Sequence, residues 1–268
     1  MTGTTAGNGE FADATVVVTG GGAHTGRGLG IGEATVRRFV GEGARVVVAD
    51  VDREMCERTV DAVSGPGEAI PVETDVADWD SVAALGEACE DLGGVDVLVN
   101  NAGIRIPEGP LPAADPDDVE RIVSVNLVGM ARTMAALVPL MEAGAVVNVA
   151  SANASLGRPG WAPYDAAKAG VLGLTRDAAC DHAPEIRVNA VAPGWTVTDY
   201  HIERGDRDPD RFLEEETTSR RDRGRNVLGR GAHPREQAAA IRWLASEEAS
   251  FVTGTTLHVD GGYHAGRP

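Results

Sequence analysis

Hydrophobic positions along the chain follow two alternating patterns. Short runs rich in valine alternate with longer segments in which apolar residues recur every three or four positions, the spacings typical of buried strands and amphipathic helices. The runs predict strands at residues 14–19, 45–50, 69–74, 95–99, 145–150, 186–191 and 256–259. The longer segments predict helices at residues 32–41, 52–64, 78–92, 117–141, 161–181 and 234–247.

This alternation predicts the fold class. Continuous valine runs are typical of parallel strands that are covered on both sides. Strands that alternate with helices form right-handed crossovers, with helices on both faces of the sheet. We therefore expect an α/β protein with one Rossmann-type, doubly wound parallel sheet of about seven strands. No linker or repeat divides the chain, so we expect a single domain over residues 1–268.

Composition narrows the class of protein. Hydrophobic residues make up 43% of the 268 residues, which suits a sizeable core, and the net charge of -17 argues against nucleic-acid partners. The chain shows no basic start before an apolar run and no apolar stretch of about 20 residues, so we expect neither a secretory signal nor a membrane anchor. Its three widely spaced cysteines suit free thiols, and we expect a cytoplasmic protein.

A glycine-rich loop follows the first predicted strand. Residues 19–32 read TGGGAHTGRGLGIG, and such a loop before a helix lets the backbone approach a pyrophosphate. Asp50 ends the second strand, 18 residues after Gly32, close to the spacing at which a carboxylate binds the adenosine ribose. It would repel a 2′-phosphate, so NAD is favoured over NADP. The simpler alternatives are a flexible loop and a turn or helix-cap aspartate.

Tyr164 and Lys168 form a YxxxK pattern, and Lys168 is the only lysine of the chain. Residues four apart lie on one face of a helix, so the ammonium is expected near the phenol. A nearby cation lowers the pKa of a tyrosine from about 10 and makes it a usable base for alcohol oxidation. An exposed helix pair is the alternative interpretation.

Taken in order, these motifs resemble those of the short-chain dehydrogenase/reductase family, over roughly residues 14–262. Thr19-Gly20 and Gly30-Ile31-Gly32 look like two halves of its TGxxxGxG motif, separated by a six-residue insertion. Gly22, Gly26 and Gly28 offer a second alignment, and Arg27 of the insertion could tolerate a 2′-phosphate. The first alignment is preferred because it keeps the helix length and the spacing to Asp50 normal.

The resemblance implies a set of cofactor contacts that includes the motifs Asp-Val, Asn-Asn-Ala-Gly and Pro-Gly-x-x-x-Thr. They are Gly20, Gly30, Ile31, Gly32, Asp50, Asp75, Val76, Asn101, Ala102, Gly103, Tyr164, Lys168, Pro193, Gly194, Thr196 and Thr198.

The resemblance also implies the catalytic group. Tyr164 is the general acid/base, and Lys168 lowers its pKa and binds the ribose hydroxyls of the cofactor. Ser151 binds the substrate oxygen, with Ser155 as an alternative, and Asn126 orders a proton relay. Expected substrate contacts are Ser151, Asn153, Trp161 and Tyr200, with His201 and Arg105 as further candidates. The histidines show no metal-ligand spacing, so no metal is expected, and His182, His233, His258 and His264 are interpreted as structural or surface residues.

Two segments depart from the alternation. Residues 199–230 follow a cofactor motif, and residues 201–230 contain eight acids and eight arginines. A long charged segment is either a disordered loop or a lid, and we favour a substrate lid. Residues 1–13 are expected to be a flexible N-terminus.

The expected function is hydride transfer between NAD(H) and a secondary alcohol or ketone. The alternatives are an NADP-dependent 3-oxoacyl-thioester reductase, against which Asp50 argues, and a protein that senses NAD without turnover, against which the complete proton relay argues. The resemblance further implies a homotetramer built through the helices at residues 117–141 and 161–181. The substrate class is a small alcohol or carbonyl compound, and its identity is not readable.

Overall fold

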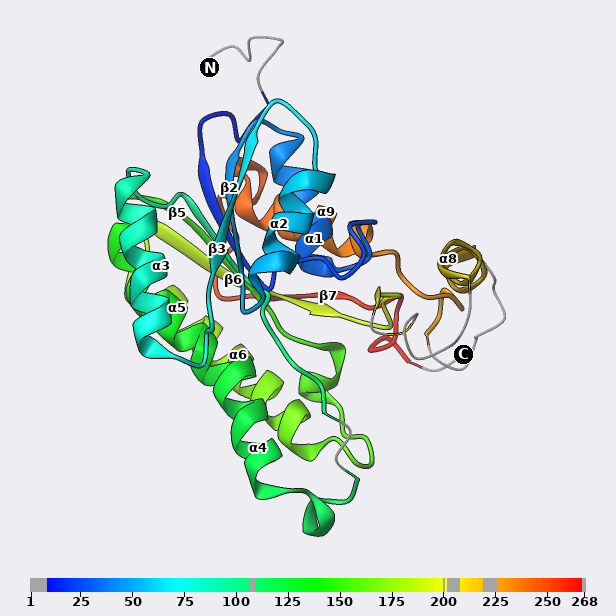
Figure 1. Ribbon diagram of the computed structural model, residues 1–268. Helices are drawn as coiled ribbons and strands as arrows, with labels where there is room; N and C mark the ends of the chain where they lie inside the picture. Colours follow the sequence, from blue (N-terminus) through cyan, green and yellow to red (C-terminus); the bar gives the residue numbers. More distant parts are fainter. Residues whose placement is uncertain (1–8, 107–108, 200, 202–207, 219–225, 267–268) are drawn as a thin grey trace.

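A computed structural model describes residues 9–106, 109–199, 201, 208–218 and 226–266. Seven parallel strands form one sheet in the order β3-β2-β1-β4-β5-β6-β7 (Figure 1). The strands are β1 (Thr15–Thr19), β2 (Arg45–Asp50), β3 (Glu68–Glu73), β4 (Val97–Asn100), β5 (Gly144–Val149), β6 (Ile186–Pro193) and β7 (Thr256–Val259). The α/β, doubly wound prediction is confirmed, and β4 begins two residues later than the sequence pattern indicated.

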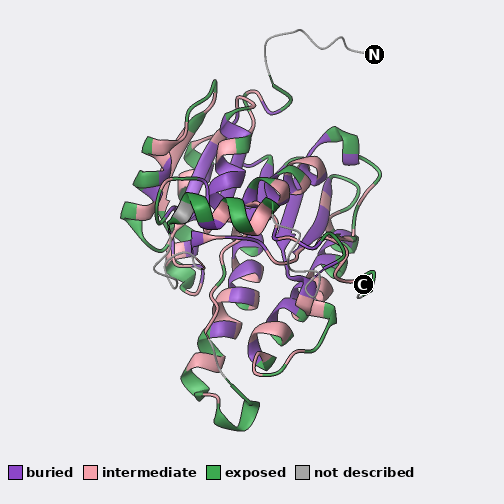
Figure 2. Cartoon of the chain, turned by 90° about the vertical axis from the view of Figure 1, so that its right-hand side faces the viewer, coloured by how far each residue is buried: buried purple, intermediate pink, exposed green. Residues whose placement is uncertain are grey.

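Helices cover both faces of this sheet. One layer holds α1 (Ile31–Val40), α2 (Arg53–Ala62) and α9 (Pro234–Ala245); the other holds α3 (Trp79–Asp91), α5 (Gly129–Leu137) and α6 (Ala162–His182). Val16 and Val18 pack toward Phe39 of α1, whereas Val17 between them packs toward the opposite layer. This alternation buries the strands on both sides (Figure 2), as the uninterrupted valine runs require.

The helix predicted at residues 117–141 is interrupted. It consists of α4 (Pro116–Val123), one π-helical turn (Ser124–Val128), α5 and a final 3₁₀ turn (Val138–Leu140). Asn126 lies within the π turn, and such turns are frequent at functional sites. The segment Pro116–Leu140 is long and apolar enough to cross a membrane by composition, but it packs in the core against α3, α6 and β4.

The structure describes the last five residues of the stretch predicted to be flexible. Of the predicted flexible stretch 1–13, residues 1–8 lie outside the described part, and residues 9–13 fold against α1 and α9. Phe11 is buried edge-on against Phe39 at a centroid distance of 4.8 Å, and Glu10 pairs with Arg242. A single large apolar residue in a polar stretch was the signal for this packing.

The polar segment after β6 contains a helix that its composition did not reveal. Within the predicted lid at residues 199–230, the structure describes residues 199, 201, 208–218 and 226–230, including α8 (Pro209–Thr218). Phe212 of α8 is buried against Leu29 and Val197. Tyr200 and the remaining lid residues lie outside the described part.

Candidate active site

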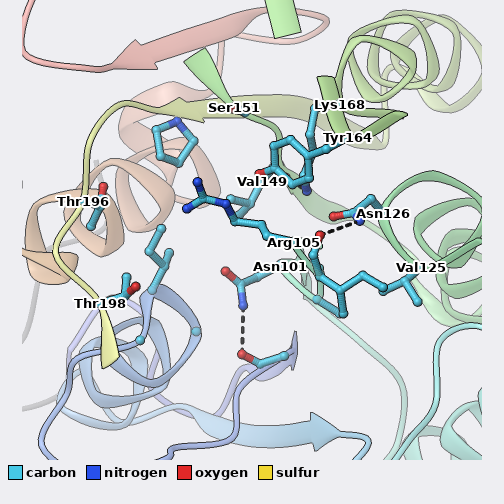
Figure 3. Close-up of a pocket in the computed structure, with 18 of the residues that line it drawn as sticks. Asn101, Arg105, Val125, Asn126, Val149, Ser151, Tyr164, Lys168, Thr196 and Thr198 are labelled. Atoms are coloured by element: carbon cyan, nitrogen blue, oxygen red, sulfur yellow. Dashed lines mark hydrogen bonds between the residues drawn. The ribbon is translucent and has the colours of Figure 1, made fainter. Parts of the chain in front are cut away.

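A cavity of about 950 Å³ opens where the parallel strands end (Figure 3). Loops that follow the carboxyl ends of parallel strands meet at one edge, which is why distant motifs converge here. The predicted site residues that line it are Gly20, Gly30, Ile31, Gly32, Asp50, Asp75, Val76, Asn101, Ala102, Gly103, Asn126, Ser151, Asn153, Tyr164, Lys168, Pro193, Gly194, Thr196 and Thr198. Trp161 is not part of the lining, and Tyr200 lies outside the described residues.

Glycines form a close-fitting cradle at the first end of the cavity. Gly20 has a φ of +64°, and a Cβ on Gly32 would lie 2.0 Å from the carbonyl oxygen of Gly20. The Asn101 amide donates to the carbonyls of Thr19 and Gly20 at 3.0 and 2.8 Å, which fixes this turn. Gly30 is the N-cap of α1 and offers no side-chain cap, so backbone N–H groups face the cavity edge. These features fit a dinucleotide pyrophosphate.

The same geometry separates the two alignments of the glycine motif. Gly20, Gly30 and Gly32 lie at the junction of β1 and α1, whereas Gly22, Gly26 and Gly28 belong to the inserted loop. Gly22 and His24 of that loop also line the cavity, while Thr25 and Arg27 contact residues that follow β6. Thr25 donates to Asp199 at 3.2 Å, and Arg27 pairs with Asp210 of α8 at 3.4 Å. Arg27 is therefore engaged with α8 in this structure.

Asp50 and the Asp75-Val76 pair form the adenosine end. Asp50 Oδ2 accepts a hydrogen bond from the Gly22 N–H at 3.0 Å. Burial raises the pKa of Asp50, and hydrogen bonds from Gly22 and from neighbouring backbone groups lower it. Asp75 accepts from the Ala77 N–H at 2.8 Å, which orders the turn in which Val76 is buried.

The four expected catalytic residues meet at the other end, although three separate elements carry them. Tyr164 and Lys168 lie on α6, Ser151 follows β5, and Asn126 belongs to the π turn. Lys168 Nζ donates to the Val149 carbonyl at 2.8 Å, and burial lowers the pKa of this lysine to about 7.

Gly103 is the point at which Asn126 and Lys168 converge. A Cβ on Gly103 would lie 2.7 Å from Asn126 Oδ1 and 3.5 Å from Lys168 Nζ. The amide nitrogen of Asn126 donates to the carbonyls of Ile104 and Ile122 at 2.9 and 3.0 Å. These two bonds leave Asn126 Oδ1 facing Gly103, buried and without a hydrogen-bond partner among the described residues.

The pKa of Tyr164 is raised, and two arginines act against that increase. Burial raises the pKa of Tyr164, while the charges of Arg105 and Arg158 and a hydrogen bond with Ser151 lower it. The Lys168 ammonium, expected to be the neighbouring cation, lies 6.0 Å from the tyrosine ring centroid. Sequence reasoning named Arg105 but missed Arg158; its place between Ser151 and Tyr164 was the available signal.

Trp161 packs against Tyr164 and the two arginines. Its ring lies edge-on to Tyr164 at a centroid distance of 6.3 Å. The Cζ atoms of Arg105 and Arg158 lie 5.1 and 4.2 Å from the centroid of the Trp161 ring. Both guanidinium groups therefore lie over the ring that was expected to contact the substrate.

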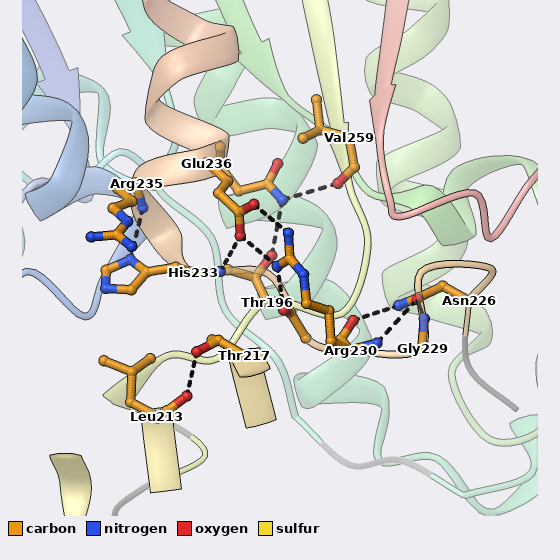
Figure 4. A network of polar contacts seen from close by, with 12 residues as sticks. Thr196, Leu213, Thr217, Asn226, Gly229, Arg230, His233, Arg235, Glu236 and Val259 are labelled. Carbon is orange, nitrogen blue, oxygen red and sulfur yellow. Dashed lines mark hydrogen bonds and ion pairs between the residues drawn. The ribbon is translucent and has the colours of Figure 1, made fainter. Parts of the chain in front are cut away.

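The loop after β6 is anchored by α9. Gln237 Nε2 donates to Thr196 Oγ1 at 3.2 Å and to the Val259 carbonyl at 2.9 Å, and Arg230 pairs with Glu236 (Figure 4). Thr198 Oγ1 lies 3.0 Å from His201 Nδ1. Of the two predicted cofactor contacts, Thr196 is thus held by α9 and Thr198 by a neighbour in its own loop.

One group of possible metal ligands occurs among the described residues. Ligand atoms of His258, Asp260 and His264 lie within 4.8 Å of one another. Asp260 already accepts from the backbone of Gly262 and His264 and from the His264 ring. These bonds order the turn that follows β7.

A glycine cradle, an acidic adenosine end and a tyrosine–lysine pair at a parallel-sheet edge define a nicotinamide-dependent oxidoreductase. A family model described as enoyl-(acyl carrier protein) reductase matches residues 25–264. The chain is 42% identical to cis-4-hydroxycyclohexanecarboxylate dehydrogenase of Sinomonas cyclohexanicum over 95% of its own length and 98% of that protein. It is 39% identical to meso-2,3-butanediol dehydrogenase of Serratia marcescens, covering 89% and 92%.

Structural comparison agrees. A solved short-chain dehydrogenase/reductase family protein superposes with a TM-score of 0.80 at 34% identity, covering 96% of this chain and 100% of that one. The chain belongs to the short-chain dehydrogenase/reductase family. It is an oxidoreductase that acts on CH–OH groups with NAD or NADP.

Proposed function

We propose that this protein oxidises a secondary alcohol to a ketone, reversibly, with NAD as the hydride acceptor. The observation that carries the proposal is the meeting of Ser151, Tyr164, Lys168 and Asn126 at one end of a cavity whose other end fits a dinucleotide. Both relatives named above are dehydrogenases of secondary alcohols by their names, which supports the substrate class.

Each residue then has a role in the reaction. Bound NAD supplies the hydride acceptor at C4 of its nicotinamide. The Ser151 hydroxyl orients the carbinol oxygen, and the Tyr164 phenolate accepts the hydroxyl proton as the carbinol hydrogen leaves as hydride. Lys168 holds the ribose hydroxyls and passes the proton onward. Asn126 Oδ1, beside the lysine, orders the end of that relay.

Asp50 supports the choice of NAD. Its carboxylate lines the adenosine end and can accept hydrogen bonds from ribose hydroxyls, whereas a 2′-phosphate there would face a negative charge. Arg27, the candidate that could offset that repulsion, pairs with Asp210. These contacts argue against the NADP-dependent 3-oxoacyl-thioester reductase, and the complete proton relay argues against an NAD sensor without turnover.

The proposal also includes a cellular compartment and an oligomeric state. Cys56, Cys89 and Cys180 are free thiols, as suits the cytoplasm. We expect a homotetramer whose only substrates are small molecules, with no nucleic-acid or membrane partner.

A turnover screen tests the proposal. Purified protein is mixed with a panel of cyclic and open-chain secondary alcohols and either NAD or NADP, and reduced cofactor is followed by absorbance. We expect turnover with NAD and a lower kcat/KM with NADP. Asp50→Ala should narrow that difference at least about tenfold, and preference of the native protein for NADP would refute the assignment of Asp50.

A further inference from the structure

The inserted loop, residues 21–29, contacts both ends of the cavity. It follows β1, and the Gly22 N–H donates to Asp50 Oδ2 at 3.0 Å at the adenosine end. On its other side, Thr25 Oγ1 lies 3.2 Å from each carboxylate oxygen of Asp199, to which it donates. The loop therefore joins segments that follow β2 and β6, which are separated in the sheet by β1, β4 and β5.

Charged side chains of the two neighbouring helices hold the backbone of this loop. Glu33 of α1 is buried and accepts a hydrogen bond from the Gly28 N–H at 2.7 Å. Arg37 of the same helix donates to the Gly26 carbonyl at 2.6 Å. Arg58 of α2 donates to two further carbonyls of the loop, at 2.6 and 2.9 Å. A backbone that is bound at several points can keep a contacting segment in one position.

The loop also holds the chain on both sides of Thr198. Leu29 packs against Val197, and the Asp199 N–H donates to the Leu29 carbonyl at 3.2 Å. With the bond from Thr25, these contacts fix the residues directly before and after Thr198. Thr198 lines the cavity and follows β6, the neighbour of β5, which leads into the catalytic serine. The inserted loop thus reaches the segment expected to contact the nicotinamide half of the cofactor.

We propose that the inserted loop positions the nicotinamide half of the cofactor, with Thr25 as a positioning residue that acts through Asp199 on Thr198. This inference rests on the proposed function, because the contact from Thr198 is part of that cofactor assignment. Thr25 lies within the insertion, so the uninterrupted glycine motif has no counterpart of it. Asp199 is buried and also interacts with other residues, so loss of the bond should shift the segment rather than release it.

The test separates the two halves of the cofactor. Calorimetry measures the Kd of NAD and of ADP-ribose, which lacks the nicotinamide, and the ratio of the two constants reports the nicotinamide half alone. We expect ADP-ribose to bind the native protein at least about fivefold more weakly than NAD, the scale of one net hydrogen bond. Thr25→Val removes an exposed hydroxyl and should bring this ratio toward one, with the Kd of ADP-ribose unchanged.

Kinetics with a secondary alcohol give a second readout. Thr25→Val should lower kcat at saturating NAD about tenfold, because small displacements of a reacting group are costly. The control Thr25→Ser keeps the hydroxyl, so both the binding ratio and kcat should stay within about twofold of the native values.

Three results would overturn the inference. They are a native binding ratio near one, an equal loss in the valine and serine variants, and an equal weakening of NAD and ADP-ribose binding by valine, which would mean a purely structural role. Absence of NAD reduction with every alcohol, while valine still lowers the binding ratio, would instead refute the proposed function and leave the positioning role intact.

Discussion

Two opposing effects act on the pKa of the Tyr164 hydroxyl group. Burial disfavours its phenolate, and the charges of Arg105 and Arg158 favour it. Burial is the larger effect, so the pKa of Tyr164 is raised, and the arginine charges offset only part of that increase.

Tyr164→Phe removes the acid/base hydroxyl and keeps the ring. We expect kcat to fall at least about 10²-fold, the usual scale for a general acid/base, while NAD binding changes little. Steady-state kinetics together with NAD titration by calorimetry measure both quantities. Near-native turnover in this variant would remove Tyr164 from its assigned role.

Lys168 gives a stability prediction, because burial lowers the pKa of this lysine to about 7 from an unfolded value of about 10.4. Between these two values the unfolded chain binds more protons than the native one, so the free energy of unfolding rises with pH. Below pH 7 both states are protonated, and the native state carries the full cost of the buried charge.

Lys168→Met removes that cost and also the hydrogen bond to Val149. At pH 6 we expect the variant to be more stable than the native protein by on the order of 2 kcal/mol, since one pKa unit is worth about 1.4 kcal/mol. The advantage should shrink as the pH approaches 10. Urea unfolding at pH 6, 8 and 10 measures it, and a difference independent of pH would contradict the depressed pKa.

At the scale of elements, the period of the sequence located the strands and helices well but not their irregularities. The π turn at Ser124–Val128 has the same apolar spacing as its flanking helices, so no pattern revealed it. This turn matters for the site because it contains Asn126, whose side-chain oxygen faces Gly103. The polar composition of α8 gave no indication of a helix, although Phe212 packs one face of it against the rest of the protein.

The lid hypothesis becomes a prediction about α8. Phe212 holds this helix against Leu29 of the inserted loop and Val197 of the cofactor motif, so ligand binding at that motif should stabilise α8. We expect amide exchange in α8 to slow when NAD and the ketone product are bound. Equal exchange with and without ligands would make α8 a fixed structural element.

A variant sharpens this test. Phe212→Ala should accelerate exchange in α8 at least about tenfold, because a buried phenylalanine contributes roughly 1.5–3 kcal/mol. It should also lower kcat/KM. The control Phe251→Ala removes a fully exposed ring and should change neither quantity.

At the scale of the whole molecule, the homotetramer that the family resemblance implies stays a prediction. Its expected contact is formed by the helical segment Pro116–Leu140 and by α6, and Val128 of the first segment is 37% exposed.

We expect sedimentation velocity at micromolar concentration to give a tetramer. Ala169 is exposed on α6, which packs against α4. Ala169→Glu would place a charge in the expected contact and should shift the protein to smaller species, whereas Ser64→Glu on a distant exposed loop should not. A monomeric native protein would refute the assembly.

The sequence by itself determined the sheet, the two helix layers and the position of most site residues. Strand–helix periodicity and glycine at tight turns are local requirements, so they are visible in the chain. The placement of Gly20, Gly30 and Gly32 at the junction of β1 and α1 follows from the same local rules.

Only the tertiary structure decided what surrounds Tyr164. Arg105 and Arg158 come from different connections of the sheet and reach the tyrosine because parallel strands end at a common edge. The packing of Phe11 on Phe39 and of Phe212 on Leu29 likewise joins residues far apart in the chain. Such contacts depend on three-dimensional proximity, so the sequence can mark Phe11 or Arg158 as candidates but does not identify the residues that they contact.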